Sequence, residues 1–196
     1  IDVLNNSFSS WGISFVLSSI DYNINSNWFN NDNEQDYKQQ LAISPSTTLN
    51  IYTTTASGYL GYAYLPNQWI EDSYMHGIVI NYKTLPGVYN WEYDSGDTAV
   101  HEVGHYLGLL HTFDGGCYGN GDYVSDTPFQ DNGNNIYDCW EMDTCPESSG
   151  SDPIYNYMNY TDDACISQFT IGQLNRIDYM LSTYKPNLGI SDSDGD

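Results

Sequence analysis

Three histidines and one glutamate within a short stretch of this chain could assemble a metal site that performs hydrolysis. Residues 101–111 read H-E-V-G-H-Y-L-G-L-L-H. On an α-helix, His101 and His105 lie about one turn apart on the same face, so both imidazoles can bind one ion. Glu102 lies beside them and can act as general base toward a water molecule. The spacing therefore predicts a zinc site with hydrolytic chemistry.

The end of the motif supplies a third ligand. Gly108 accepts the left-handed backbone conformation that ends a helix and turns the chain back. His111 can then return to the ion and complete a tripod of imidazoles. Three neutral protein ligands leave a fourth position of Zn²⁺ open, which distinguishes catalytic zinc sites from structural ones.

The zinc motif must lie on a helix, and a second helix is predicted near the end of the chain. We expect the first helix to begin at about Asp97, a candidate N-cap, and to end at Leu107. The Thr170-x-x-Gln173 pattern is a capping box, and the helix that follows it must stop before Pro186.

Strands are predicted ahead of the motif. Segments rich in Val, Ile, Tyr and Thr and bounded by turn residues are typical of strands. A loop and a short helix are expected within residues 22–40, and His76 is expected to be an ordinary residue at a strand end. The predicted strands are residues 13–20, 48–54, 61–65 and 77–82.

Residues 113–163 are rich in Gly, Asp and Asn and form too long a stretch for an ordinary loop. Such a stretch needs cross-links, and we expect disulfides and structural Ca²⁺ to supply them. Solvated turn residues are the alternative interpretation of its acidic side chains. Candidate oxygen ligands for Ca²⁺ are Asp114, Asp122, Asp126 and Thr127.

All four cysteines follow the zinc motif, which predicts two disulfides and an oxidising compartment. Four cysteines allow three pairings, and the residues alone do not choose between them. A second zinc site is the alternative, although no C-x₂-C pair is present. The cysteines are Cys117, Cys139, Cys145 and Cys165.

Beyond the zinc motif, Met158 lies between tyrosines in a segment similar to the methionine turn of metzincin zinc peptidases. Within the metzincins, the chain resembles the pappalysin family and its ulilysin-like members. The resemblance rests on residues 60–66, 93–98, 111–113, 115–117, 126–128, 156–165 and 169–173.

The resemblance implies an α+β metzincin-type catalytic domain over residues 1–190. Its expected architecture is a mixed twisted sheet, a zinc helix in the upper lobe (about 1–108) and an irregular lower lobe (about 109–190) stabilised by disulfides and calcium. The opening strand and long helix of the family are not found ahead of Ile1. Residues 191–196 are interpreted as the start of an acidic linker, with a Ca²⁺-binding repeat as the alternative.

Individual roles are also implied by the resemblance. Met158 forms an apolar base beneath the metal, and Tyr160 supports the tetrahedral intermediate. Asp163 forms the acidic floor of the pocket that receives the side chain after the scissile bond, with Asp162 as an adjacent competitor. The implied disulfide pairings are Cys117–Cys145 and Cys139–Cys165.

These observations predict a secreted zinc endopeptidase that cleaves on the N-terminal side of Lys or Arg. A protein or peptide substrate would add as a strand along the edge formed by Gly61, Tyr62 and Ala63. One alternative is a metzincin of another branch with apolar specificity. Another is an extracellular binding module that keeps zinc for structure, although such a module has no use for Glu102.

The charge balance excludes some partners. The chain carries 26 acidic residues against 4 basic ones, which gives a net charge of −22. Nucleic acid is therefore not an expected partner, because phosphate binding needs a basic surface. An acidic cleft would instead steer basic peptides toward the metal.

No apolar run is long enough to span a membrane. The chain is expected to act as a monomer.

Overall fold

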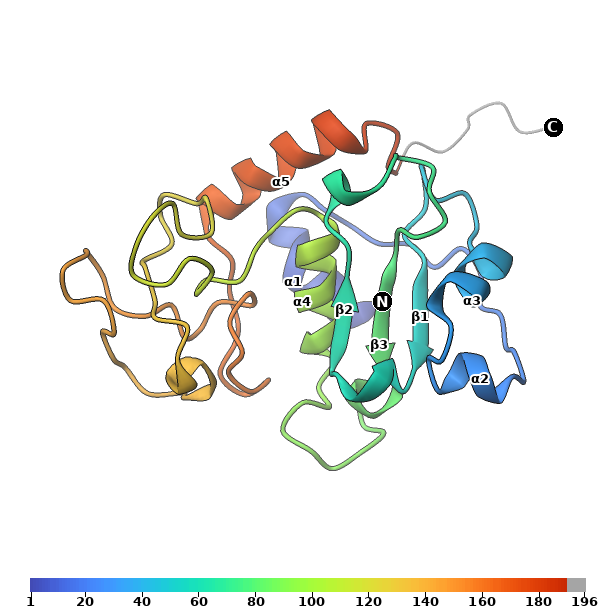
Figure 1. The fold of residues 1–196 in the computed structure, drawn as a ribbon, viewed down its shortest axis with the longest axis horizontal. Coiled ribbons are helices and arrows are strands. Elements are labelled where there is room, and N and C mark those ends of the chain that lie inside the picture. Colours follow the sequence, from blue (N-terminus) through green and yellow to red (C-terminus); the bar gives the residue numbers. More distant parts are fainter. Residues whose placement is uncertain (190–196) are drawn as a thin grey trace.

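The computed structural model describes residues 1–189, and its regular part is a small mixed sheet covered by a helix (Figure 1). Strands β1 (Ile51–Thr54), β2 (Gly61–Ala63) and β3 (Ile78–Asn81) lie in the order β1-β3-β2. β1 pairs with β3 in parallel, and β2 pairs with β3 antiparallel. One edge of β2 therefore has no partner strand among the described residues.

Helix α4 (Asp97–Tyr106) carries the zinc motif and packs against β2 and β3. Val100 and Val103 of α4 are fully buried in the same apolar cluster as Ile78 and Ile80 of β3. All four residues of β3 are buried, as expected for a central strand covered on both faces. Apolar burial thus fixes the orientation of the helix that bears two of the candidate metal ligands, His101 and His105.

Short helices surround this centre, and α5 (Ile171–Tyr184) runs across one end of the molecule (Figure 1). The predicted capping box of α5 is confirmed: Gln173 donates its backbone N–H to Thr170 Oγ1 at 3.1 Å, and Thr170 donates in return at 2.8 Å. The remaining helices are α1 (Asp2–Phe8), η1 (Ser9–Trp11), α2 (Ser26–Phe29), α3 (Glu34–Leu41), η2 (Ala56–Gly58), η3 (Pro66–Gln68), η4 (Tyr82–Thr84) and η5 (Asn134–Tyr137).

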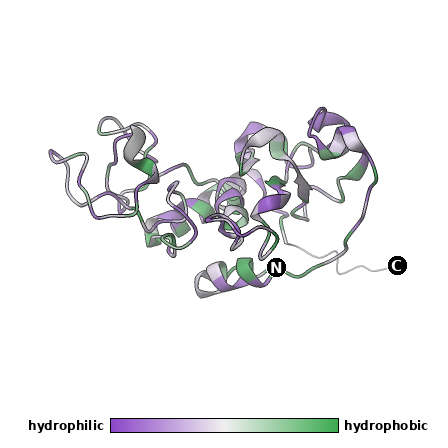
Figure 2. Cartoon of the chain, turned by 90° about the horizontal axis from the view of Figure 1, so that it is seen from below, coloured by the Kyte–Doolittle hydropathy of each residue, from purple (hydrophilic) through white to green (hydrophobic). Residues whose placement is uncertain are grey.

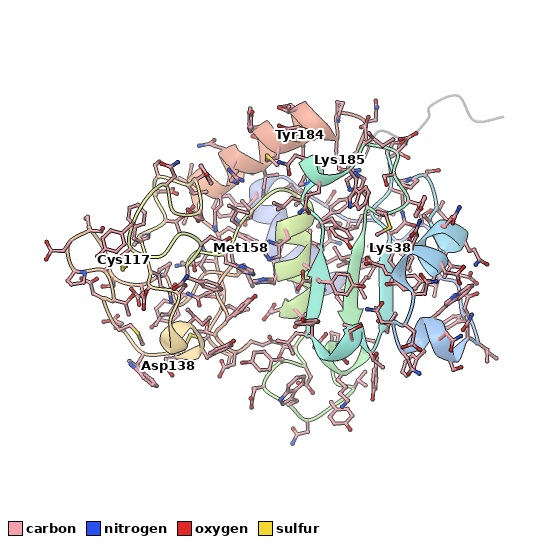
Figure 3. The ribbon with its side chains drawn as sticks, in the orientation of Figure 1. Lys38, Cys117, Asp138, Met158, Tyr184 and Lys185 are labelled. Atoms are coloured by element: carbon pink, nitrogen blue, oxygen red, sulfur yellow. A yellow bond between two sulfur atoms is a disulfide. The ribbon has the colours of Figure 1, made fainter. Side chains whose placement is uncertain are left out.

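The last turn of α5 is fastened to the rest of the fold by a buried lysine. Lys185 is 1% exposed, and its ammonium group donates to the backbone carbonyls of Pro45 at 3.0 Å and Glu71 at 3.1 Å. Figure 3 shows Lys185 pointing from the end of α5 toward the segments beside the sheet. One side chain thereby joins three parts of the chain.

Residues 113–165, called the irregular region below, contain no helix or strand except η5. In Figure 2 this coil is mostly purple or pale with short green stretches, so long apolar segments are missing from it. Two disulfides cross-link it, Cys117–Cys145 and Cys139–Cys165, and both implied pairings are confirmed. The two disulfide loops are interleaved, since each contains one cysteine of the other.

Two sequence predictions are wrong in detail. Residues 13–20 form no strand, and Val16 and Ile20 lie exposed. Apolar composition does not make a strand without a hydrogen-bonding neighbour, and here Phe15 pairs its backbone with the side chain of Asn5 instead. The N-cap of α4 is Gly96, with φ of 98°, rather than Asp97.

The other predicted strands are found in shorter form, and two short helices lie in the region where one was expected. The mixed α+β architecture is confirmed. Within residues 1–189, no helix combines the length and apolarity that a membrane crossing requires. The predicted acidic linker at residues 191–196 lies outside the described residues.

Candidate metal centre and substrate cleft

The three histidines of the motif converge on one point. One nitrogen from each of His101, His105 and His111 lies within 4.8 Å of the others, and no other such cluster of His, Cys, Asp or Glu occurs among the described residues. His105 Nε2 and His111 Nε2 are 3.0 Å apart. His76, by contrast, lies apart from this cluster and contacts the carbonyl of Ile70 through Nε2 at 3.0 Å.

Hydrogen bonds on the far side of the rings orient two of these ligands. His101 Nδ1 lies 2.7 Å from the carbonyl oxygen of Tyr157, and His105 Nδ1 lies 2.8 Å from that of Leu109. A carbonyl only accepts, so each Nδ1 carries the proton and each Nε2 presents a lone pair to the centre. The two backbone carbonyls therefore select the tautomer that binds metal.

The charge state of the cluster also suits a cation. Burial and the neighbouring imidazoles hold the pKa of His101 well below its usual range and lower the pKa of His105 to about 4. The rings of His101 and His105 are therefore neutral near pH 7. Three neutral imidazole nitrogens with an open side are the donor set of a catalytic Zn²⁺ site, so the residues fit this ion.

Glu102 lies beside the three histidines and lines the same cavity. Its side chain is 5% exposed, its Oε2 atom is buried without a hydrogen-bond partner, and burial raises its pKa to about 8. A β-carbon at Gly61 would lie 2.8 Å from Glu102 Cγ, so the glycine in β2 leaves room for this carboxyl group. A raised pKa makes the ionised form of this group a stronger base, so beside the three histidines it can receive a proton from water.

The turn after α4 returns the chain so that His111 joins the other two histidines, as predicted. Gly108 has φ of 110°, a conformation that favours glycine. A β-carbon at this position would also lie 2.5 Å from Met180 Cγ of α5. Arg176 donates through Nε to the carbonyl of Gly108 at 2.8 Å. Helix α5 therefore packs directly on the turn that delivers His111.

The methionine turn lies beneath the tripod. Met158 is fully buried, and a β-carbon at Gly104 would collide with its sulfur atom. Thr112, directly after the third ligand, donates its backbone N–H to the Met158 carbonyl at 3.2 Å. Figure 3 places Met158 beside α4. The turn thus provides an apolar base for the ligands and backbone acceptors for their neighbours.

An aromatic group covers one side of the tripod. The ring centroid of Tyr160 lies 4.7 Å from that of His111 and 4.8 Å from that of Phe113. The rings of Phe113 and His111 stack, with their centroids 4.8 Å apart. Burial and the nearby Glu102 raise the pKa of Tyr160 to about 12. Tyr160 therefore keeps its hydroxyl proton at neutral pH and can donate a hydrogen bond to an oxyanion.

A cleft of about 1010 Å³ opens over these groups. The predicted edge residues of β2 line it, and so does Asp163, whereas Asp162 does not. Asp163 is buried and accepts a hydrogen bond from the backbone N–H of Ser95 at 2.8 Å. The structure thus brings together the following predicted residues: His101, His105, His111, Glu102, Tyr160, Asp163, Gly61, Tyr62 and Ala63.

Some cleft residues were not singled out from the sequence for this place. Asp97 was interpreted only as a helix cap, yet it lines the cleft, and burial and the nearby Asp163 raise its pKa to about 7. Three aromatic residues also line the cleft, and they carry no spacing or period that would assign them to it. They are Trp91, Tyr93 and Tyr137.

The candidate calcium ligands are divided between different places. Asp122 and Thr127 line a second cavity of about 470 Å³, and both Asp122 Oδ2 and Thr127 Oγ1 are buried without a hydrogen-bond partner. Asp114 instead accepts from the backbone N–H of His111 at 3.1 Å. Asp126 accepts from Gly172 N–H at 2.8 Å, at the start of α5.

Comparison with known proteins places these features in context. Residues 44–182 match the peptidase family model described as pregnancy-associated plasma protein-A. An extracellular metalloprotease of Colletotrichum graminicola is 43% identical over 94% of this chain and 68% of its own length. Another from Sordaria macrospora is 41% identical over 97% of this chain and 68% of its own length.

A solved structure is similar as well. Mature mirolysin of Tannerella forsythia in complex with a cleaved peptide superposes with a TM-score of 0.66 and 36% sequence identity. The match covers 76% of this chain but only 58% of that chain. The fold described above is therefore similar to part of that longer protein.

Proposed function

Because the chain belongs to the pappalysin family of metallopeptidases, we propose that it is a secreted zinc endopeptidase. The observation that carries the proposal is the buried, unpartnered Glu102 carboxyl oxygen beside three converging imidazoles in an open cleft. The two disulfides suit an oxidising compartment, and the relatives are named as extracellular proteins. We propose that the domain acts as a monomer.

Each group in the cleft has its own role in the proposed hydrolysis. Zn²⁺ bound by the three histidines would polarise the scissile carbonyl and lower the pKa of a water molecule. Glu102 takes a proton from that water as it attacks the carbonyl, and then passes the proton to the leaving amine. The Tyr160 hydroxyl donates a hydrogen bond to the developing oxyanion.

The substrate adds to the sheet as an extended strand. β2 is antiparallel to β3 on one side, and its other side faces the cleft through Gly61, Tyr62 and Ala63. The free backbone groups of such an edge bind a peptide main chain regardless of its sequence. Side-chain pockets along the cleft must therefore supply the specificity.

We propose that the specificity is for Lys or Arg after the scissile bond. Asp163 and Asp97 both line the cleft, and burial raises the pKa of each. A desolvated pair of carboxyl groups is stabilised by a cation between them, which a long basic side chain provides. Asp163 lines the cleft and its neighbour Asp162 does not, which favours Asp163 as the counter-ion.

Cleavage profiling on a peptide library tests the activity and the specificity together. We expect cleavage that a chelator abolishes, with Lys or Arg enriched after the scissile bond. Asp163→Ala should weaken transition-state binding of Arg peptides by roughly 2–5 kcal/mol while apolar peptides are unaffected. The matched variant is Asp162→Ala. If only that variant loses basic specificity, the role belongs to Asp162, and enrichment of Leu or Phe would reject both assignments.

We also propose a structural Ca²⁺ at the second cavity. A buried carboxylate oxygen and a buried hydroxyl without partners, Asp122 Oδ2 and Thr127 Oγ1, are the oxygen donors that this cation prefers. The pKa of Asp122 is raised by burial to about 6, a cost that a bound cation would offset. Calorimetric Ca²⁺ titration should detect binding to the native chain, and Asp122→Asn should weaken it. Binding that survives in this variant would contradict the proposed ligand.

A further inference from the structure

Tyr137 lies outside every motif of the sequence, yet its ring contacts the tyrosine that faces the metal. Its ring centroid is 5.8 Å from that of Tyr160, with an angle of 26° between the ring planes. Tyr137 is 58% exposed and lines the cleft. It therefore stacks on Tyr160, whose ring in turn meets the stacked rings of Phe113 and His111 edge to face.

The position of Tyr137 is fixed by its neighbours in the chain. It is the last residue of η5, directly before Asp138, which Figure 3 labels. Ile136, on one side, is buried, and Cys139, on the other, forms the disulfide with Cys165. A covalent bond thus joins the segment that carries Tyr137 to the segment that follows Asp163. The backbone that carries this exposed ring is therefore anchored on both sides.

The stack has a consequence for Tyr160. Its inner side is fixed by contacts with His111 and Phe113, and its outer side faces the cleft except where Tyr137 covers it. Offset stacking restrains both the position and the tilt of a ring. Removal of the outer ring would let Tyr160 turn into the cleft, and a displaced hydroxyl would meet an oxyanion less well.

We propose that Tyr137 is a positioning residue that acts through Tyr160 and not through direct contact with the substrate. The inference rests on the proposed peptidase function and on the assigned role of the Tyr160 hydroxyl. A direct stacking surface for a substrate side chain is the competing explanation, and it predicts a change in KM instead of kcat.

Kinetics on a fluorogenic peptide separate the two explanations. We expect Tyr137→Ala to lower kcat about fivefold and leave KM within roughly twofold, because a ring stack is a modest interaction. Tyr137→Phe keeps the ring and should restore kcat. Tyr118→Ala is the matched control, since Tyr118 is an 85% exposed tyrosine of the same irregular region that does not line the cleft.

A double-mutant cycle shows whether the effect passes through Tyr160. Tyr160→Phe removes the hydroxyl, so Tyr137→Ala should cause no further loss of kcat in that background. Additive losses, an increase in KM alone, or wild-type kcat in Tyr137→Ala would overturn the inference. If Tyr160→Phe itself has wild-type kcat, the inference fails together with the assigned role of Tyr160, whereas full activity of Glu102→Ala would reject the proposed function.

A second measurement needs neither metal nor substrate. Signals of ¹³C-labelled tyrosine, assigned to Tyr160 by comparison with Tyr160→Phe, should shift in Tyr137→Ala because the ring current of the neighbour is lost. They should stay unchanged in Tyr118→Ala. An unchanged Tyr160 signal in Tyr137→Ala would show that the two rings are not stacked in solution.

Discussion

The sheet with α4 and the irregular region contribute to the same cleft, but different forces hold them in place. In the first, the ligands lie on a helix whose buried valines pack against a buried strand. In the second, coil is held by disulfides and by side chains that bond to the backbone, as Asn156 does to the N–H of Met158 at 2.9 Å. Apolar burial therefore positions His101, His105 and Glu102, whereas the irregular region, held by its cross-links, supplies Tyr160 and Asp163 to the cleft.

The largest expected effect lies in the regular part, where activity can be removed without loss of the fold. Glu102→Ala should retain about one zinc per chain, because the three histidines remain, and should lose roughly 10²–10⁴-fold in cleavage rate. Zinc content by elemental analysis and casein cleavage measure both quantities. Glu102→Gln is the matched control with the same shape. Cleavage near the wild-type rate in either variant would refute the assigned proton transfer.

Removal of a cross-link should instead lower stability in the irregular region. The double variant Cys117→Ser, Cys145→Ser removes one disulfide and leaves Cys139–Cys165 intact. We expect it to lower the unfolding free energy by about 2–5 kcal/mol. Urea denaturation measures this cost. The second double variant, Cys139→Ser with Cys165→Ser, should also lose stability. It should in addition lower kcat as Tyr137→Ala does, because it frees the segment that carries Tyr137. An unchanged unfolding free energy in both variants would show that the disulfides do not hold this region.

Acid should destabilise the regular part through His76. Burial and the nearby Lys185 and Lys38 lower the pKa of this histidine to about 4, so the unfolded chain takes up its proton first as pH falls. Stability should thus decrease between about pH 6.5 and pH 4, by an amount on the order of 3 kcal/mol. His76→Gln does not titrate but can still donate to the Ile70 carbonyl. Urea denaturation of both proteins at several pH values should show a smaller acid loss in the variant, and equal losses would contradict the assignment.

The smallest effect on stability is expected where the irregular region contacts the start of α5. Asp126 accepts hydrogen bonds from Thr170 Oγ1 at 2.7 Å and from the N–H of Gly172 at 2.8 Å, and so caps α5 from the irregular region. Asp126→Ala should lower the unfolding free energy by about 1 kcal/mol. Ca²⁺ affinity should be unchanged, because the proposed site lies at Asp122. A loss of Ca²⁺ binding in Asp126→Ala would move that site toward α5.

Local patterns in the sequence predicted much of the regular part. The spacing of His101, His105 and His111 specifies one face of a helix and a turn, and Gly108 has the positive φ expected of it. The capping box at Thr170 has both of its hydrogen bonds. Such features depend on residues a few positions apart, so the sequence records them directly. The prediction of a strand at residues 13–20 is wrong because a strand also needs a second strand, distant in sequence, to pair with.

The irregular region could be predicted only in part. Resemblance to a family gave the two disulfide pairings, which the residues alone left open among three. The contact between Tyr137 and Tyr160 and the cap that Asp126 places on α5 join residues far apart in sequence. Long-range contacts of single side chains have no period or spacing, so the sequence carries no local signal for them.

The interleaved disulfides also determine what a backbone cut would do to the molecule. A cut between Cys117 and Cys139 leaves the two pieces joined by Cys117–Cys145, and a cut between Cys145 and Cys165 leaves them joined by Cys139–Cys165. Between the two inner cysteines, both bonds bridge the gap. A nick anywhere in this stretch therefore leaves His111 and Met158 in one covalent unit.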